Sequence, residues 1–227
     1  MQYDCKIAVI LHFVTKDVKP AGLRAARVRE NEERIVRAAH ELFVRDGYQA
    51  TTLTAVADAA GVAHRTVYVR FGTMAALLKR VIDVALVGDL APVDVVSREW
   101  YRTATTAATL EERIAAAAQG SARLMASAAD IIAVGREAAL AEPVLAAAAN
   151  AGRAATRDAV RTFWVRALDD GLLPPECDLA WLADTTSVLA HAETYLLMRD
   201  TLGMTPPAYE TWLATTWRRM AAAATQS

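Results

Sequence analysis

The fold is decided by residues 51–78, which read TTLTAVADAAGVAHRTVYVRFGTMAALL. Thr52 suits the start of a short helix, because its hydroxyl can accept a hydrogen bond from a first-turn amide. The helix that follows has one apolar face, formed by Leu53, Val56, Ala57 and Ala60. Gly61 ends it, since glycine takes the left-handed conformation that a sharp corner needs. The pattern predicts two short helices that meet at a tight turn.

The second of these helices is predicted over residues 64–71. Val67 and Phe71 are four residues apart and therefore share its inward face. The outward face carries polar and basic side chains, namely His64, Arg65, Thr66, Tyr68 and Arg70. A short helix with such a face, held across a glycine corner by a small apolar helix, has the geometry that enters the major groove of DNA.

A longer ordered motif surrounds this corner. It reads Ile35-x-x-Ala38-Ala39-x-x-Leu42-Phe43-x-x-x-Gly47-Tyr48-x-x-Thr51-Thr52-x-x-x-Val56-Ala57-x-x-Ala60-Gly61-Val62-x-x-x-Thr66-Val67-Tyr68-x-x-Phe71. Over residues 30–80 the chain resembles the N-terminal DNA-binding domain of the tetracycline-repressor (TetR) family. The rest of the chain carries no motif and is judged only by its architecture.

The resemblance implies an all-α fold and a division of the chain. A flexible N-terminal arm is expected over residues 1–28, a three-helix helix-turn-helix DNA-binding domain over 29–78, and a helical ligand-binding and dimerisation domain over 79–227. It further implies a homodimer that binds a palindromic operator in double-stranded DNA as a repressor. A small, largely apolar inducer is expected to release it.

The resemblance also carries residue roles. Thr51, Thr52, Thr66, Tyr68 and Arg70 are candidates for contacts with DNA phosphates. His64 and Arg65, with Thr66 and Tyr68 sharing the task, are candidates for contacts with base edges. A guanidinium can hold guanine O6 and N7 together, although Arg65 is equally compatible with a phosphate contact.

Three positions depart from the family pattern. Ala63 stands where the family usually has a Ser that caps the recognition helix, and alanine accepts no amide hydrogen bond. Arg65 replaces a frequent Gly or Pro. Thr73-Met74 replaces a frequent Ser-Lys, so the cap of the next helix is kept and the phosphate-binding charge is lost.

Charge is divided unevenly along the 227 residues. The net charge of −1 gives no sign of a nucleic-acid partner, but residues 1–80 hold 13 Lys and Arg against 8 Asp and Glu, whereas residues 81–227 hold 12 against 18. A basic head on an acidic body fits DNA contact through the head alone. Residues 1–28 are either an arm that carries Lys16, Lys19, Arg24, Arg27 and Arg29 toward DNA or a solvated tail that follows a start site placed too far upstream.

Helix-period patterns and breakers predict the remaining elements. Helices are expected over residues 31–46, 73–87, 109–126, 130–140, 143–169, 178–202 and 208–223, with residues 88–108 less regular. Thr109 and Glu112 form a capping box at one start, and Pro143 and Asp178 open two others.

The last two long helices are apolar on more than one side. Trp181, Val188 and Tyr195 form a second stripe on one of them, and Trp212 and Trp217 belong to the other. The surplus apolar surface predicts pairing with a second copy in a four-helix bundle, as the family also implies. The alternative is an ordinary core within one chain.

Enzyme signatures are missing from the sequence. It has no glycine-rich phosphate loop and no zinc or nucleophile motif, and His191-Ala192-Glu193 lacks the Pro-Cys-x-x-Cys that a zinc deaminase needs. Cys5 and Cys177 lie in unrelated segments. We expect a cytoplasmic protein without catalytic residues, cofactor, metal or membrane partner.

A ligand site is a weaker expectation. Eight side chains are candidates for lining a mostly apolar pocket, or else belong to a plain core: Trp100, Tyr101, Met125, Phe163, Trp164, Trp181, His191 and Tyr195. Two alternatives to the repressor stay open. One is a helical small-molecule-binding or enzymatic protein whose head has lost DNA binding, and the other is a TetR-type activator that responds to no ligand.

Overall fold

The computed structural model describes residues 23–87 and 95–224. Within these ranges the chain forms ten α-helices, one short 3₁₀ turn and no strand, which confirms the all-α prediction. The elements are α1 (Leu23–Asp46), α2 (Leu53–Ala60), α3 (His64–Phe71), α4 (Met74–Val87), η1 (Val95–Ser97), α5 (Glu99–Thr106), α6 (Leu110–Ala138), α7 (Pro143–Asp169), α8 (Leu179–Leu189), α9 (Ala192–Leu202) and α10 (Pro206–Ala223).

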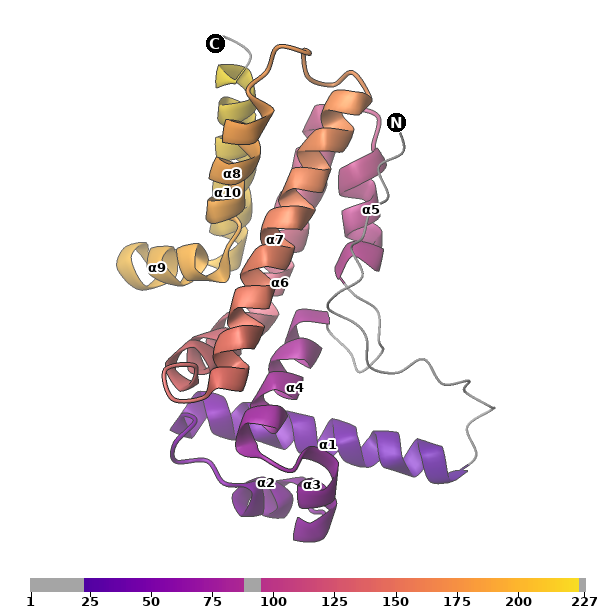
Figure 1. The fold of residues 1–227 in the computed structure, drawn as a ribbon, viewed down its shortest axis with the longest axis vertical. Helices are drawn as coiled ribbons and strands as arrows, with labels where there is room; N and C mark the ends of the chain where they lie inside the picture. The colour runs from indigo at the N-terminus through magenta and orange to yellow at the C-terminus, as the bar shows by residue number, and fades with distance from the viewer. Residues whose placement is uncertain (1–22, 88–94, 225–227) are drawn as a thin grey trace.

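The helices form a head and an elongated body (Figure 1). Helices α1, α2 and α3 make the head at one end, and α4 leads from the head into the body. Helices α6 and α7 run the length of the body, with α5 beside them. Helices α8 and α10 lie together along the body, and α9 projects away from it.

The core of the head is built on one stripe of α1. Ile35, Ala39 and Phe43 are fully buried there and pack with Val56 of α2 and Val67 of α3. The same apolar cluster takes in four buried residues of α4 and three from the body: Ala75, Leu77, Leu78, Val81, Ile131, Ala138 and Leu145. The head therefore has no core separate from the end of the body on which it rests.

A hydrogen bond fixes the same junction from the side. The hydroxyl of Tyr48, in the turn after α1, donates to Oε1 of Glu142 at the α6–α7 turn, 2.8 Å away. Burial, together with this bond and the carboxylate charge, raises the pKa of Tyr48 to about 12.

The body has an aromatic centre. The rings of Phe163, Trp164 and Trp217 lie 4.7–5.6 Å apart, centroid to centroid, and all three are buried. The Trp164 indole N–H donates to Thr186 Oγ1 at 2.7 Å, and the Tyr209 hydroxyl donates to the Leu189 carbonyl at 2.8 Å. These contacts join α7, α8 and α10 in one core.

Most predicted helix starts are confirmed. Thr109 and Glu112 form the capping box in both directions, and the Asp178 carboxylate accepts the Trp181 amide hydrogen bond at 3.0 Å. Thr73 caps α4 through the amide of Ala76, at 3.1 Å, and Pro143 is the first residue of α7.

One helix start and one whole helix differ from the prediction. Helix α1 starts at Leu23, so residues 23–28 of the expected arm are helical, because Ala, Arg and Leu there favour a helix and no glycine or proline interrupts them. The first 22 residues, with Lys16 and Lys19, lie outside the described residues. Helix α5 was missed within the segment expected to be irregular; residues 88–94 are likewise not described.

Two predictions of helix continuity were wrong: one helix was predicted as two, and two helices were predicted as one. Residues 110–138 form one helix, α6, because Ser127 satisfies its hydroxyl on the carbonyls of Arg123, Leu124 and Ala85 instead of breaking the helix. The predicted helix over 178–202 is instead two, α8 and α9. His191 is extended between them (φ −74°, ψ 147°), a turn that no glycine or proline in the sequence marks.

We predict that Gly120→Ala destabilises the protein by about 1–3 kcal/mol through overpacking. A Cβ at Gly120 in α6 would lie 2.1 Å from Trp100 Cε3, where the ring of α5 packs against the helix. The matched control is Gly152→Ala in α7, where a Cβ meets no atom within 4 Å. That change should stabilise by about 0.5–1 kcal/mol. Urea unfolding midpoints measure both, and equal stabilisation would contradict the prediction.

Candidate nucleic-acid interface

The corner between α2 and α3 has the predicted chemistry. Thr52 Oγ1 accepts the Ala55 amide hydrogen bond at 3.1 Å and so caps α2. Gly61 takes the left-handed conformation (φ 62°), and its N–H bonds to the Asp58 carbonyl at 3.1 Å. Arg34 of α1 donates to the Gly61 carbonyl at 3.0 Å, which ties the corner to the first helix.

Helix α3 turns one residue inward and many outward. Val67 is its one fully buried side chain, and Phe71 is half-buried against the same core. Tyr68 and Val69 are large side chains left in solvent, with Val69 72% exposed. Ala63 makes no side-chain bond at the N-terminus of α3, as the sequence predicted.

The two threonines before α2 use their hydroxyls inside the head. Thr51 is buried, and its Oγ1 donates to the Gly47 carbonyl at 2.8 Å. Thr52 is exposed and caps α2. Their roles toward phosphates stay predictions, but in the free protein both side chains already hold the local backbone.

Other predicted DNA-binding residues gather around one surface hollow. Leu53 and Thr54 of α2, with His64, Arg65 and Tyr68 of α3, line it. His64 Nε2 lies 2.7 Å from Asp58 Oδ1, and Arg65 and Tyr68 are exposed. Thr66 is half-buried at the first turn of α3. A guanidinium, an imidazole, a phenol and the hydroxyl of Thr54 thus surround one hollow, a setting in which a phosphate or a base edge finds donors.

Arg70 is the exception among the predicted DNA-binding residues. Its guanidinium forms an ion pair with Glu32 of α1, and Arg80 of α4 donates to the other oxygen of the same carboxylate at 2.9 Å. Glu32 was missed at the sequence level. The signal was present, because Glu32 lies three residues before Ile35 and so continues the buried stripe of α1, where a carboxylate needs cationic partners.

Val69 was also missed. It lies next to Tyr68 on the exposed side of α3, where an apolar side chain has no partner in the head. A valine in a major groove can contact the methyl group of thymine. The signal was present, because Val69 lies on the outward face of the predicted helix. Only the polar side chains of that face had been considered.

The predicted ligand-lining residues are divided between the core of the body and its surface. Met125, Phe163, Trp164 and Tyr195 are buried in the body core. Trp100 packs on Gly120, and the Tyr101 hydroxyl donates to the Ala159 carbonyl at 3.0 Å. The last two, Trp181 and His191, lie on α8 and just after it. Trp181 is exposed, and burial lowers the pKa of His191 at the α8–α9 turn despite the nearby carboxylate of Glu193.

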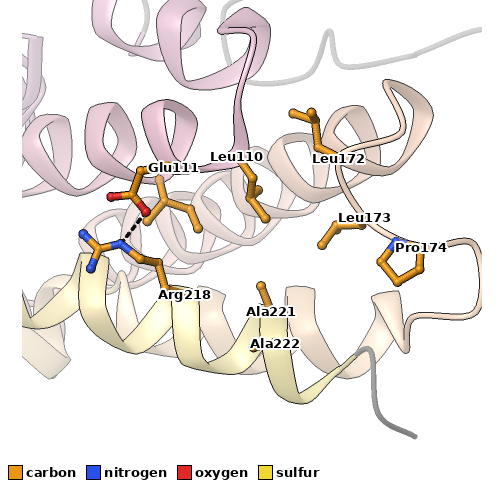
Figure 2. A pocket seen from close by; sticks show the side chains of 9 residues that line it. Leu110, Glu111, Leu172, Leu173, Pro174, Arg218, Ala221 and Ala222 are labelled. Carbon is orange, nitrogen blue, oxygen red and sulfur yellow. Dashed lines mark ion pairs between the residues drawn. The ribbon is translucent and has the colours of Figure 1, made fainter.

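A shallow hollow does exist at the far end of the body (Figure 2). Its walls come from the start of α6, the segment after α7 and the end of α10. The lining is apolar except at the rim, where Arg218 Nε lies 2.8 Å from Glu111 Oε2. None of the eight candidates lines it.

Two further searches cover the described residues alone. No helix among residues 23–87 and 95–224 is long and apolar enough to cross a membrane. In the same ranges, no three His, Cys, Asp or Glu side chains come together as a possible metal site.

Comparison with known proteins agrees with this geometry. The model of a family described as bacterial regulatory proteins, tetR family, matches residues 35–81. A search of curated protein sequences finds no match.

Solved structures resemble the chain over most of its length. NalD of Pseudomonas aeruginosa, described as the secondary repressor of the MexAB-OprM multidrug efflux pump, is 17% identical with a TM-score of 0.63, covering 86% of this chain and 96% of its own. FadR of Bacillus halodurans, a fatty acid degradation regulator, is 16% identical with a TM-score of 0.62, covering 88% and 96%. SmeT in complex with triclosan is 18% identical with a TM-score of 0.65, covering 85% and 90%. At these identities the likeness shows a shared fold.

The glycine corner, the outward α3 and the two-part helical architecture define a helix-turn-helix DNA-binding transcriptional regulator. The family match falls on the head that forms this corner, and the fold over most of the chain is the one seen in solved regulators described as TetR-family. Residues 35–81 therefore match the DNA-binding domain of the tetR family, and the rest of the chain shares a fold with solved structures.

We predict that Ala63→Ser stabilises the free protein by about 0.5–2 kcal/mol. The backbone at Ala63 is extended (φ −64°, ψ 138°), so a serine can cap the first amides of α3 without strain. Urea unfolding measures the gain, and hydrogen exchange should show added protection at the amides of residues 65–67. Ala154→Ser, at an exposed position inside α7, is the control and should bring no gain. Equal exchange at those amides in the Ala63→Ser variant and the parent protein would show that α3 is already well formed without the cap.

Proposed function

We propose that the protein is a dimeric, ligand-responsive repressor that acts in the cytoplasm. Each head reads one half of a near-palindromic operator, and a small, largely apolar inducer releases the dimer from DNA. The observation that carries the proposal is α3 itself, a helix anchored by Val67 whose outer face presents Arg65, Tyr68 and Val69 to solvent. A helix held in this way enters a major groove as a rigid reader.

The proposed division of labour on DNA follows from exposure. Arg65 contacts a guanine edge, with His64 beside it at the N-terminal end of α3. Tyr68, Thr66 and Thr52 contact phosphates, where hydroxyl donors fix the register of the head but carry no sequence information. Thr51 supports them by holding the turn before α2.

Helix α8 supplies the proposed dimer face. Trp181 and Val188 are exposed along it, and seven residues separate them, so they share one side of the helix. The aromatic residues expected to do the same on α10 belong to the chain's own core. Tyr209 and Trp217 are buried, and Trp212 stacks on Tyr209. This burial supports the intramolecular alternative for Tyr209 and Trp217.

The body core is the proposed inducer site. Phe163, Trp164 and Tyr195 lie in it, and the buried indole N–H of Trp217 finds no hydrogen-bond acceptor among the described residues. An aromatic ligand with an oxygen acceptor would supply the missing partner. The triclosan complex of SmeT, a protein of similar fold, supports a compact aromatic ligand of this kind.

The function is tested by gel shift. The purified protein is titrated against DNA that flanks its own gene, with random DNA as competitor and with candidate inducers added. Specific retardation that an inducer reverses supports the repressor. Retardation without any response supports a regulator that needs no ligand, and failure to retard any flanking DNA would leave a binding or enzymatic protein whose head has lost its function.

We predict that Arg65→Ala weakens operator binding by about 1–3 kcal/mol and relaxes the preference at one base pair in each half-site. Binding to a panel of operators substituted at single positions measures this. Arg218→Ala, which removes the same charge from the far end of α10, is the control and should leave affinity unchanged. A uniform loss across all operators would make Arg65 a phosphate contact instead.

We predict that Val188→Glu separates the dimer. Val188 is 58% exposed on α8, and a carboxylate buried in a symmetric interface would face its own copy across the two-fold axis. Sedimentation equilibrium at micromolar concentration should show dimer for the unaltered protein and monomer for the variant. Leu140→Glu places the same charge at a residue 92% exposed in the α6–α7 turn and should stay dimeric. An unaltered protein that sediments as a folded monomer would refute the dimer.

A further inference from the structure

We propose that Glu32 is a positioning residue for DNA reading. It holds the C-terminal end of the recognition helix α3 through Arg70, so that Arg70 acts on operator binding through Glu32 and not through a DNA phosphate. The inference rests on the proposed function, and it replaces the phosphate role that the family resemblance gives to Arg70.

The geometry joins three helices at one carboxylate. Glu32 of α1 is only 6% exposed. Its Oε2 accepts from Arg70 Nη2 of α3, and its Oε1 accepts from Arg80 Nε of α4 at 2.9 Å. Each oxygen is thus bound by a guanidinium from a different helix. A desolvated carboxylate depends on such partners, so the arrangement constrains all three helices at once.

Helix α3 has few other anchors. It is eight residues long, Val67 is its one fully buried side chain, and Ala63 gives its N-terminus no side-chain cap. Val67 and the half-buried Phe71 hold one side of α3 to the core, but two apolar contacts on the same side leave the angle of the outer face weakly determined. Arg70 lies three residues further on, at the other end of the helix, and a charged bond there sets the angle at which the outer face points.

The ion pair with Glu32 also makes the guanidinium of Arg70 less available for contact with DNA. Its side chain is half exposed, so exposure alone does not assign its role. If the guanidinium moved to a phosphate, Glu32 would keep only its bond to Arg80 inside the head. The burial of that carboxylate favours keeping Arg70 where it is.

The first test is the salt dependence of operator binding, measured by fluorescence anisotropy for the full-length protein and Arg70→Gln. Loss of a phosphate contact lowers the slope of log affinity against log salt by about 0.9 for each contact. We expect the variant to bind its operator about tenfold more weakly with the slope unchanged, because only the aim of α3 is lost. A slope reduced by about 0.9 per head would overturn the proposal.

The second test separates aim from general attraction. A misplaced α3 loses base contacts, so affinity for the operator should fall while affinity for random DNA of equal length stays the same. Loss of a phosphate contact weakens both alike. An equal loss on operator and random DNA would therefore count against the proposal.

Glu32→Gln is expected to change operator affinity in opposite directions for the two possible roles of Arg70. If Glu32 positions α3, this variant loses operator affinity and the double variant Glu32→Gln/Arg70→Gln loses no more than either single one. If Arg70 binds phosphate, removing the carboxylate charge releases Arg70 to DNA, and affinity rises. Additive losses or a gain would overturn the proposal.

Two further variants keep the result interpretable. Lys79→Gln removes a cation from the same helix as Arg80, but Lys79 pairs with Asp83, and the operator-to-random ratio should not change. Should Glu32→Gln unfold at the assay temperature, as circular dichroism would show, Arg80→Gln leaves the Arg70 bond in place and should reduce the ratio by less than Arg70→Gln. Failure of the unaltered protein to bind flanking DNA refutes the proposed function, whereas normal binding with unchanged ratios in the variants refutes only this inference.

Discussion

The packing of α4 between the head and α6 is the contact on which the arrangement depends. Leu77, Leu78 and Val81 are fully buried in a cluster that includes residues of α1 and of α6. The two helices approach so closely that a Cβ at Gly135 of α6 would lie 2.6 Å from Ile82 Cδ1. Because close-packed side chains transmit displacement and do not absorb it, a shift of α6 must move α4, and with it the head.

Basic side chains of the head have two roles, contact with DNA and stabilisation of the head itself. Residues 1–80 carry more Lys and Arg than Asp and Glu, and this excess of positive charge predicts contact with DNA. Part of that charge is used inside the head, since Arg34 binds the Gly61 carbonyl and Arg70 binds Glu32. The charge available to DNA is thus smaller than the count of basic residues.

The parts of the fold that were predictable are those set by neighbours in sequence. Caps at Thr52 and Thr109, the left-handed Gly61 and the bare start at Ala63 follow from single residues and their spacing. The missed start of α1 at Leu23 is a local preference that the sequence analysis overlooked. The other errors involve distant contacts or have no local mark. The continuation of α6 through Ser127 involves the Ala85 carbonyl, and nothing near His191 marks the break between α8 and α9. At the site, the outer face of α3 followed from periodicity, whereas the use of Arg70 depended on a carboxylate 38 residues away.

Helices with two apolar sides pose a problem that the sequence leaves open, because a core and a dimer interface demand the same residues. Trp217 is an example of a residue that lies in the core. It is buried within its own chain, yet its indole N–H has no acceptor among the residues that the structure describes, at a cost of about 1–3 kcal/mol for an unmet buried donor. A ligand that offers an acceptor offsets that cost only in the conformation that admits it, and such differential affinity is what shifts an equilibrium. Helix α10, which carries Trp217, packs on α6, and α6 packs on α4 through Gly135. The unmet donor in the body and the recognition helix are therefore connected through α6 and α4, because α4 also contacts α3.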